Sequence, residues 1–256
     1  MNAAPPARSA ANTQPAMQNL EKPEGVAAAR LLLGRASGAV TLPEQIAAEV
    51  GERIIDEKIA PGERIGEDQL ARSFHVSRGP IRDALKILER EGLVTITSRK
   101  GAVASTLTAA DLQELSDVRA GLFAIALRGF AKRVTPEVLA QYNAHLDTVA
   151  GVTNDDRLAL VWLEAIDRLV LFIAYHCGNA RAARILTTLS LQGIRYFRRA
   201  SVPALNPVAR RREVLKFYRD LGAAYAKGGN IEPSLERLQR IVVERVAAGT
   251  AALENG

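Results

Sequence analysis

Four basic side chains recur at every fourth position of one segment: Arg78, Arg82, Lys86 and Arg90. Residues four apart lie on one face of an α-helix, so this spacing predicts a continuous basic stripe along a helix. A helix fits the major groove of B-DNA, where arginine donates two hydrogen bonds to O6 and N7 of guanine and other cations meet phosphate. The chemistry that these residues can perform is therefore recognition of double-stranded DNA.

The positive charge is local rather than general. The whole chain has 34 Lys+Arg, 28 Asp+Glu, a formal net charge of +6 and a pI near 9.7, which suits a nucleic-acid partner. Within residues 72–100, basic side chains outnumber acidic ones. The basic residues are Arg72, Arg78, Arg82, Lys86, Arg90, Arg99 and Lys100, and the acidic residues are Asp83, Glu89 and Glu91. A charged stripe alone is usually a solvated surface, so its meaning depends on the elements around it.

Those elements follow the order of a winged helix-turn-helix. Thr41, Pro43 and Glu44 form a helix start, and Ser77 is placed to cap the basic helix, whose Pro80 sits in the first turn. Short β-prone pieces joined by a polar, basic hairpin tip come next. The expected elements are a helix that starts at Thr41 and is stopped by Ala60-Pro61-Gly62, helices at 67–74 and 78–91, strands at 93–96 and 102–104, and the tip at 97–101.

The residues expected at DNA fall into two groups. The first turns of a recognition helix meet base edges, which assigns base reading to Arg78 and Arg82. The second group is expected to contact phosphate or the adjacent minor groove. It consists of Ser77, Lys86 and Arg72 near the helix, and of Arg99, Lys100 and Gly101 at the hairpin tip.

Beyond residue 105 the sequence predicts only amphipathic helices, at about 108–133, 135–151, 154–177, 180–200, 207–227 and 231–253. The expected fold class is mainly α: a winged helix-turn-helix followed by an all-helical bundle of six to seven helices. The expected domains are a disordered tail or arm (1–40), the DNA-binding domain (41–105) and the helical domain (106–256).

Several other classes of protein are excluded. Cys177 is the single cysteine, so neither an intramolecular disulfide nor a cysteine-based zinc cluster can form within one chain. The N-terminus lacks the layout of a secretory signal, and no apolar run is long enough to span a bilayer, so a cytoplasmic location is expected. No P-loop, dinucleotide-binding turn, nucleophile elbow or paired-histidine motif is present, so an enzyme is not expected.

Four segments of the chain's N-terminal half resemble the GntR family of bacterial regulators: Pro61–Ile65, Leu70–Ala71, Val76–Leu85 and Leu88–Val94. The resemblance implies a winged helix-turn-helix protein that dimerises and binds a palindromic operator, most often as a repressor. It also implies that Arg78 and Arg82 are base-reading arginines and that Gly101 is the wing-tip glycine. One position departs from the pattern: Asp68 stands where the family often has arginine, so that DNA contact is expected to be lost, or replaced by Arg72 or Arg64.

The helical part resembles the effector domain of the FadR subfamily, called FCD, through Asp111–Arg119 and Asp167–Asn179. Many FCD domains bind a divalent metal with one Asp and three His, beginning with Asp-x-x-x-His. Here Leu171 stands four residues after Asp167, and the later ligand positions fall near Arg219 and Ile241, so the metal site looks degenerate and no cofactor is expected. The three histidines are His75, His145 and His176, and they lack ligand spacing.

A pocket without a metal needs another way to hold an effector. Arg119 corresponds to an arginine that in this subfamily often points into the pocket, so the hypothesis is an organic acid or acyl thioester bound at Arg119, Asp167, Leu171 and Arg219. One alternative is a pocket collapsed around Leu171, with Arg119 paired to Glu114 or Asp117. Another is a bundle that serves only dimerisation.

Overall fold

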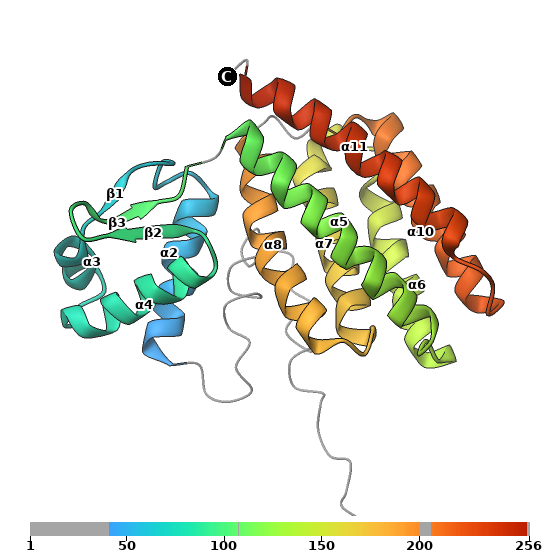
Figure 1. Cartoon of the computed structure of the whole chain (residues 1–256), viewed down its shortest axis with the longest axis horizontal. Helices are drawn as coiled ribbons and strands as arrows, with labels where there is room; N and C mark the ends of the chain where they lie inside the picture. Colours follow the sequence, from blue (N-terminus) through green and yellow to red (C-terminus); the bar gives the residue numbers. More distant parts are fainter. Residues whose placement is uncertain (1–40, 107, 200–205, 255–256) are drawn as a thin grey trace, which may run out of the picture.

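The computed structural model describes residues 41–106, 108–199 and 206–254 of the chain. The small N-terminal head contains three helices and a sheet. Figure 1 shows it beside a larger bundle of long helices. The expected fold class, mainly α with a winged helix-turn-helix ahead of a helical bundle, is confirmed. The interpretation of residues 1–40 as a disordered tail or arm lies outside the described residues.

The head contains the three expected helices, α2 (Leu42–Ile55), α3 (Glu67–Ser73) and α4 (Arg78–Arg90). Thr41 and Glu44 form a reciprocal capping box at the start of α2, as the sequence predicts. The apolar faces of the three helices and of the sheet meet in one buried cluster, which includes Ile54, Ile81 and Leu88 with no measurable exposure.

The sheet has three strands, β1 (Arg64–Ile65), β2 (Val94–Thr97) and β3 (Gly101–Ala104), in the antiparallel order β1-β3-β2. Strands β2 and β3 form the expected hairpin. Strand β1 was not predicted, because two residues are too few to show the alternating pattern of a strand. It pairs Arg64 with Val103, so the segment before α3 is tied to the wing.

Six α-helices and one 3-10 turn make up the described part of the bundle. Their bounds are α5 (Ala109–Ala131), α6 (Pro136–Val152), η2 (Asp156–Leu158), α7 (Ala159–His176), α8 (Ala180–Arg199), α10 (Val208–Ala226) and α11 (Glu232–Glu254). They enclose a second buried cluster with Trp162, Phe130 and Tyr142 at its centre. Among the described residues, no helix combines the length and apolar character that crossing a membrane requires.

Helix α8 joins the bundle to the head. Leu191 and Ile194 of α8, with Leu171 of α7, are buried in the same cluster as the head's own core. Polar contacts surround this apolar seam: the Gln192 amide donates to the Glu91 carbonyl (3.0 Å), and Arg195, only 2% exposed, donates to the Ser105 carbonyl (2.8 Å). The head is therefore held at the end of α4 and at the open end of the β2–β3 hairpin, opposite its tip.

Gly92 is the backbone position on which this junction depends. Its φ of +73° is a left-handed conformation that disfavours any side chain with a Cβ. A Cβ built at this position would also collide with the end of the Gln192 side chain, which is the group that bonds to Glu91. Glycine at 92 therefore permits both the turn after α4 and the approach of α8.

We expect Gly92→Ala to destabilise the protein by about 1–3 kcal/mol from backbone strain, with about 1 kcal/mol more from the displaced Gln192 hydrogen bond. Chemical denaturation measures this loss. The matched control is Gly101→Ala, because Gly101 has a similar φ of +71° but nothing within 4 Å of its added Cβ. Equal losses in the two variants would show that the Gln192 contact contributes nothing.

Candidate nucleic-acid interface and ligand cavity

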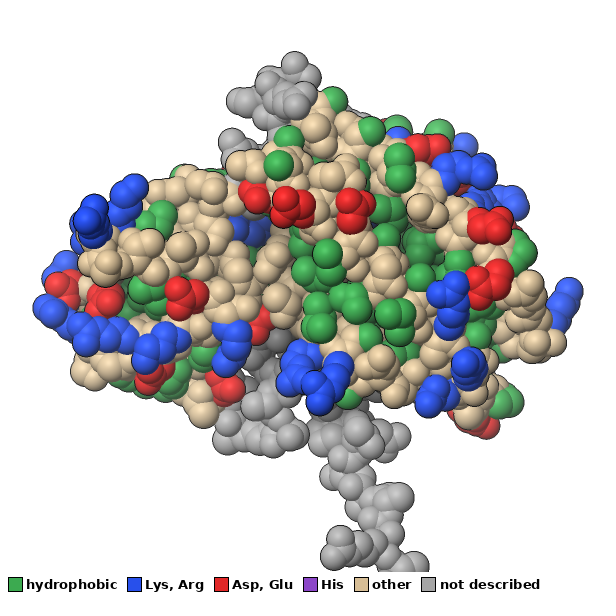
Figure 2. All heavy atoms as spheres, viewed as in Figure 1, with side chains coloured by type: hydrophobic (Ala, Val, Ile, Leu, Met, Phe, Trp, Pro, Cys, Tyr) green, Lys and Arg blue, Asp and Glu red, His purple; other side chains and the backbone are tan. Residues whose placement is uncertain are grey.

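The predicted basic stripe lies on the exposed face of α4. The side chains of Arg78, Arg82, Lys86 and Arg90 are 61%, 60%, 70% and 72% exposed, while Ile81, on the opposite face, is fully buried. Figure 2 shows Lys and Arg side chains in a row over α4, at the lower edge of the head, with acidic side chains next to them. The helix therefore combines a face anchored in the core with a basic face turned to solvent.

The other residues expected at DNA lie around this helix. Ser77 is the N-cap residue of α4, but its side chain makes no capping hydrogen bond, which leaves the hydroxyl exposed at the helix start. Arg72 is exposed in the last turn of α3. Arg99 and Lys100 are exposed in the turn between β2 and β3, and Gly101, with its φ of +71°, begins β3.

Sequence reasoning missed the partners of the two leading arginines. Asp68 lies against Arg78, with Oδ1 2.5 Å from Nε, and Glu67 accepts a hydrogen bond from Nε of Arg82 at 2.8 Å. That hydrogen bond raises the pKa of Arg82. Asp68, identified from sequence only as a lost contact, is thus placed beside Arg78. A sequence signal for these ion pairs did exist. Two adjacent acidic residues begin the first helix of the helix-turn-helix, and two arginines begin the second.

A separate cavity lies inside the bundle, between α5, α7, α10 and α11. It has a volume of about 80 Å³. Its polar lining includes Arg119, Arg210, Arg245, Asn206 and Tyr218, and its apolar lining includes Trp162, Phe123 and Ile166. Three arginines from three different helices therefore line one cavity.

Asp167 supplies a negative charge beside these arginines. Its Oδ1 accepts a 2.7 Å bond from Nη2 of Arg119, and the two side chains are only 10% and 18% exposed. Burial raises the pKa of Asp167, and Arg119 opposes that shift. Burial also lowers the pKa of Arg245 to about 10, and the positive charge of Arg119 adds to the effect. Burial therefore penalises the charged forms of both Asp167 and Arg245, and an added anion would offset the part of the cost at Arg245 that comes from the charge of Arg119.

Several buried donors on the cavity's lining residues lack a hydrogen-bond partner among the described residues. They are Nε of Arg119, Nε1 of Trp162 and Nδ2 of Asn206. A buried donor without an acceptor costs free energy, so the lining is complementary to a ligand rich in acceptor oxygens.

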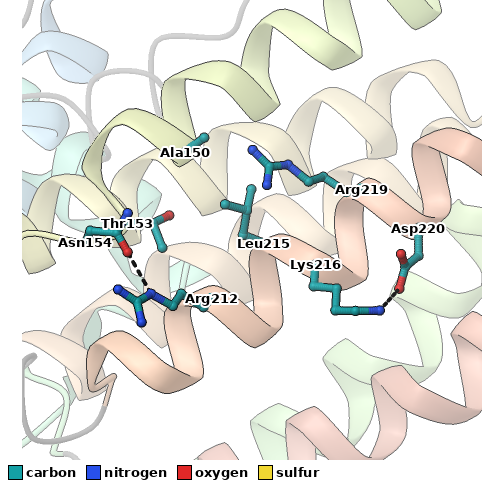
Figure 3. A pocket seen from close by; sticks show the side chains of 8 residues that line it. All are labelled: Ala150, Thr153, Asn154, Arg212, Leu215, Lys216, Arg219 and Asp220. Atoms are coloured by element: carbon teal, nitrogen blue, oxygen red, sulfur yellow. Dashed lines mark hydrogen bonds and ion pairs between the residues drawn. The ribbon is translucent and has the colours of Figure 1, made fainter.

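The four residues expected to form the effector pocket do not all meet there. Arg119 lines the cavity and Asp167 pairs with it, whereas Leu171 is buried in the cluster shared with the head. Arg219 lines a different, open hollow of about 310 Å³ beside Arg212 and Lys216, as Figure 3 shows. The alternative of a pocket collapsed around Leu171 placed Arg119 in an ion pair with Glu114 or Asp117. Arg119 does form an ion pair, but its partner is Asp167.

The histidines of the bundle stack rather than converge on a shared centre. The rings of His145 and His176 lie 4.9 Å and 4.2 Å from the ring of Phe172, and Nδ1 of His176 bonds to the Phe172 carbonyl. Burial lowers the pKa of His145. Over the ranges 41–106, 108–199 and 206–254, no three His, Cys, Asp or Glu residues are arranged to hold a metal ion.

The head and bundle together have the architecture of a DNA-binding transcription regulator. Two protein-family models match the chain: the model described as bacterial regulatory proteins, gntR family, matches residues 42–103, and the FCD domain matches residues 114–230. The chain belongs to the GntR family, with an FCD domain after its head, and that family consists of regulators rather than enzymes.

Curated relatives match over a shorter stretch. The chain is 44% identical over 80 residues to the Nta operon transcriptional regulator of Aminobacter aminovorans, covering 31% of this chain and 38% of that protein. It is 44% identical over 87 residues to the gluconate operon transcriptional repressor of Bacillus licheniformis, covering 34% of each. The chain thus spans about a third of the length of these curated relatives.

Solved structures support the fold over most of the chain. McbR/YncC of E. coli superposes with a TM-score of 0.62 at 19% identity, over 84% of this chain and 98% of that chain. Lar, described as controlling the expression of the Listeria monocytogenes agr system, gives a TM-score of 0.54 at 20% identity, over 82% and 97%. At such identity these likenesses establish the fold alone.

Proposed function

We propose that this protein is a sequence-specific DNA-binding transcription regulator that inserts α4 into the major groove. The observation that carries the proposal is the exposed basic stripe of α4. The opposite face of this helix is buried in the core of the head. In this arrangement Arg78 and Arg82 meet base edges. Phosphate or minor-groove contacts come from Arg72, Ser77, Lys86, Arg99, Lys100 and Gly101.

We expect Arg82→Ala to weaken binding to the preferred duplex by about 1–3 kcal/mol and to relax base preference at one position. Lys86→Ala is the matched control: it should weaken binding to all duplexes alike and reduce the salt dependence. Titration of labelled duplexes selected from a random library measures both effects. Equal losses for Arg82→Ala on selected and random duplexes would contradict base reading by this residue.

We propose that binding represses transcription in the bacterial cytoplasm. The support is the similarity to a gluconate operon repressor, which extends over a third of this chain. A reporter placed behind a bound promoter distinguishes the outcomes, since its expression should rise when this gene is deleted. A fall would indicate activation instead.

We propose that the bundle cavity binds a small organic acid as effector. The three arginines, the costly buried charge and the unpartnered donors all favour a ligand with carboxylate oxygens. The volume favours a small molecule, because about 80 Å³ lies well below the roughly 300–1,000 Å³ of sites for larger ligands. An acyl thioester therefore fits less well than a short mono- or dicarboxylate.

We expect short carboxylates to raise the melting temperature of the protein in a thermal-shift screen, since a ligand that binds only the folded state stabilises it. The double variant Arg119→Gln/Asp167→Asn keeps the pair neutral and should lose this ligand-induced shift. Arg219→Ala is the control, because Arg219 lines the outer hollow and its loss should leave the shift intact. If no carboxylate or acyl thioester shifts the wild type, the bundle serves dimerisation only.

We propose that two copies of the chain associate through the face formed by α5 and α8. Val118, Ile125 and Ile185 are 54%, 47% and 45% exposed there, and Gly121 leaves open space between Val118 and Ile125. Figure 2 shows hydrophobic side chains gathered over these helices. An exposed apolar patch of this kind suits a self-complementary two-fold contact, which would also present two heads to a palindromic operator.

We expect Ile125→Glu to convert a dimer to a monomer, because two carboxylates would be buried at the two-fold contact. Size-exclusion chromatography with light scattering measures the mass. Leu160→Glu is the control, since Leu160 is similarly exposed (44%) but lies on α7. A dimeric Ile125→Glu variant would place the contact elsewhere.

A further inference from the structure

Two carboxylates of α3 hold the two arginines at the start of α4. Asp68 contacts Nε of Arg78 at 2.5 Å, and Glu67 contacts Nε of Arg82 at 2.8 Å. The carboxylates occupy the first turn of α3, while the arginines occupy the first and second turns of α4. We call these four residues the α3–α4 charge cluster; its two negative and two positive charges cancel.

The contacts engage a particular edge of each guanidinium group. A guanidinium has five N–H donors in one plane, and both contacts use Nε. The described residues supply no further partner to either arginine, so the terminal Nη nitrogens remain available. Guanine is read by two parallel donors held in a plane, which the Nη pair can provide.

The cluster differs from the other ion pairs of the stripe. Lys86 pairs with Asp83 of its own helix at 3.4 Å, and Arg90 lies 3.6 Å from the adjacent Glu91. In the α3–α4 charge cluster the carboxylates come from a different helix at shorter distances. The packing of α3 on α4 therefore fixes where each carboxylate stands, and through it the orientation of each guanidinium.

We infer that Glu67 and Asp68 are positioning residues that set base specificity by holding Arg82 and Arg78 through Nε. The inference rests on the proposed function, in which α4 enters the major groove. Holding a guanidinium in its reading orientation reduces the conformational entropy lost on binding. It favours directed contacts to bases over contacts to phosphate.

Charge cancellation adds a second effect. Non-specific affinity for DNA comes mainly from cations that neutralise phosphates and release counterions. An arginine already paired with a carboxylate contributes less to that effect, but it can still donate from its Nη nitrogens. The carboxylates thus lower the affinity for random DNA while preserving contacts to guanine. The ratio of specific to non-specific affinity therefore rises.

The experiment begins with selection of a preferred duplex from a random double-stranded library by the full-length wild type. Dissociation constants are then measured for that duplex, for versions with each guanine replaced in turn, and for a random duplex, at two salt concentrations. The variants are Glu67→Gln and Asp68→Asn, compared with Arg82→Ala and Arg78→Ala. Asp83→Asn is the matched control, because it removes the same charge from α4 without touching either arginine.

We expect Glu67→Gln to lose about tenfold in discrimination at the guanine position where Arg82→Ala also loses it. Asp68→Asn should do the same at the position identified by Arg78→Ala. Both should bind random duplex more tightly, with a steeper salt dependence. Asp83→Asn should also bind random duplex more tightly but keep its discrimination. Unchanged melting temperatures confirm that these exposed substitutions leave the fold intact.

Two outcomes would overturn the inference. If all three carboxylate variants gain affinity equally and keep wild-type discrimination, the carboxylates merely repel phosphate, and the proposed function stands without the inference. If the wild type enriches no sequence, or enriches one whose guanines can be replaced without loss, both the inference and base reading by α4 fail.

Discussion

Helix α8 packs against α5 and α7 on one side and against the head on the other. Leu191 and Ile194 complete the head's core, so the head buries apolar surface that a free winged helix-turn-helix would expose to water. The contacts to Glu91 and Ser105 then fix the direction in which α4 points. The basic stripe thus takes its orientation from a helix of the neighbouring bundle.

The bundle contains an electrostatic imbalance that its fold tolerates. Taking charges out of water is costly unless they are paired and hydrogen-bonded, and the Arg119–Asp167 pair meets that condition only in part. Arg245 is buried close by with a lowered pKa. Arginine is well suited to such a place, because its charge is delocalised and its planar donors match a carboxylate. These features are the basis on which we propose a small organic acid as the ligand of the cavity.

The head also contains paired charges, but they lie at the surface instead of in the interior. Exposed ion pairs contribute little to stability, so the α3–α4 charge cluster is a poor explanation for why α3 and α4 pack together. Their packing comes from buried residues such as Leu70 and Leu85. These ion pairs stabilise the fold little. The role we infer for them is to orient two exposed guanidinium groups toward DNA bases.

Much of the fold could be predicted because its signals are local. Thr41 with Glu44, Ser77 before a periodic helix and the amphipathic repeats after residue 108 each report on a few neighbouring residues. The helix bounds accordingly agree closely with the structure. The short strand β1 was missed, since it exists only because β3 lies beside it. Leu171 and Arg219 were grouped with Arg119 because they stand at or near positions where the FCD resemblance implies metal ligands, but helix rotation within the bundle sends each to a different environment.

The sequence by itself determined the helices, the β2–β3 hairpin, the order of the two parts and the basic stripe, because periodicity, capping and turn signals depend on residues close together in the chain. Only the tertiary structure decided which charges meet. Asp167 reaches Arg119 across 48 positions, and Glu67 reaches Arg82 across 15. Such pairs depend on how helices rotate and cross as they bury their apolar faces, and those rotations are set by the whole core at once.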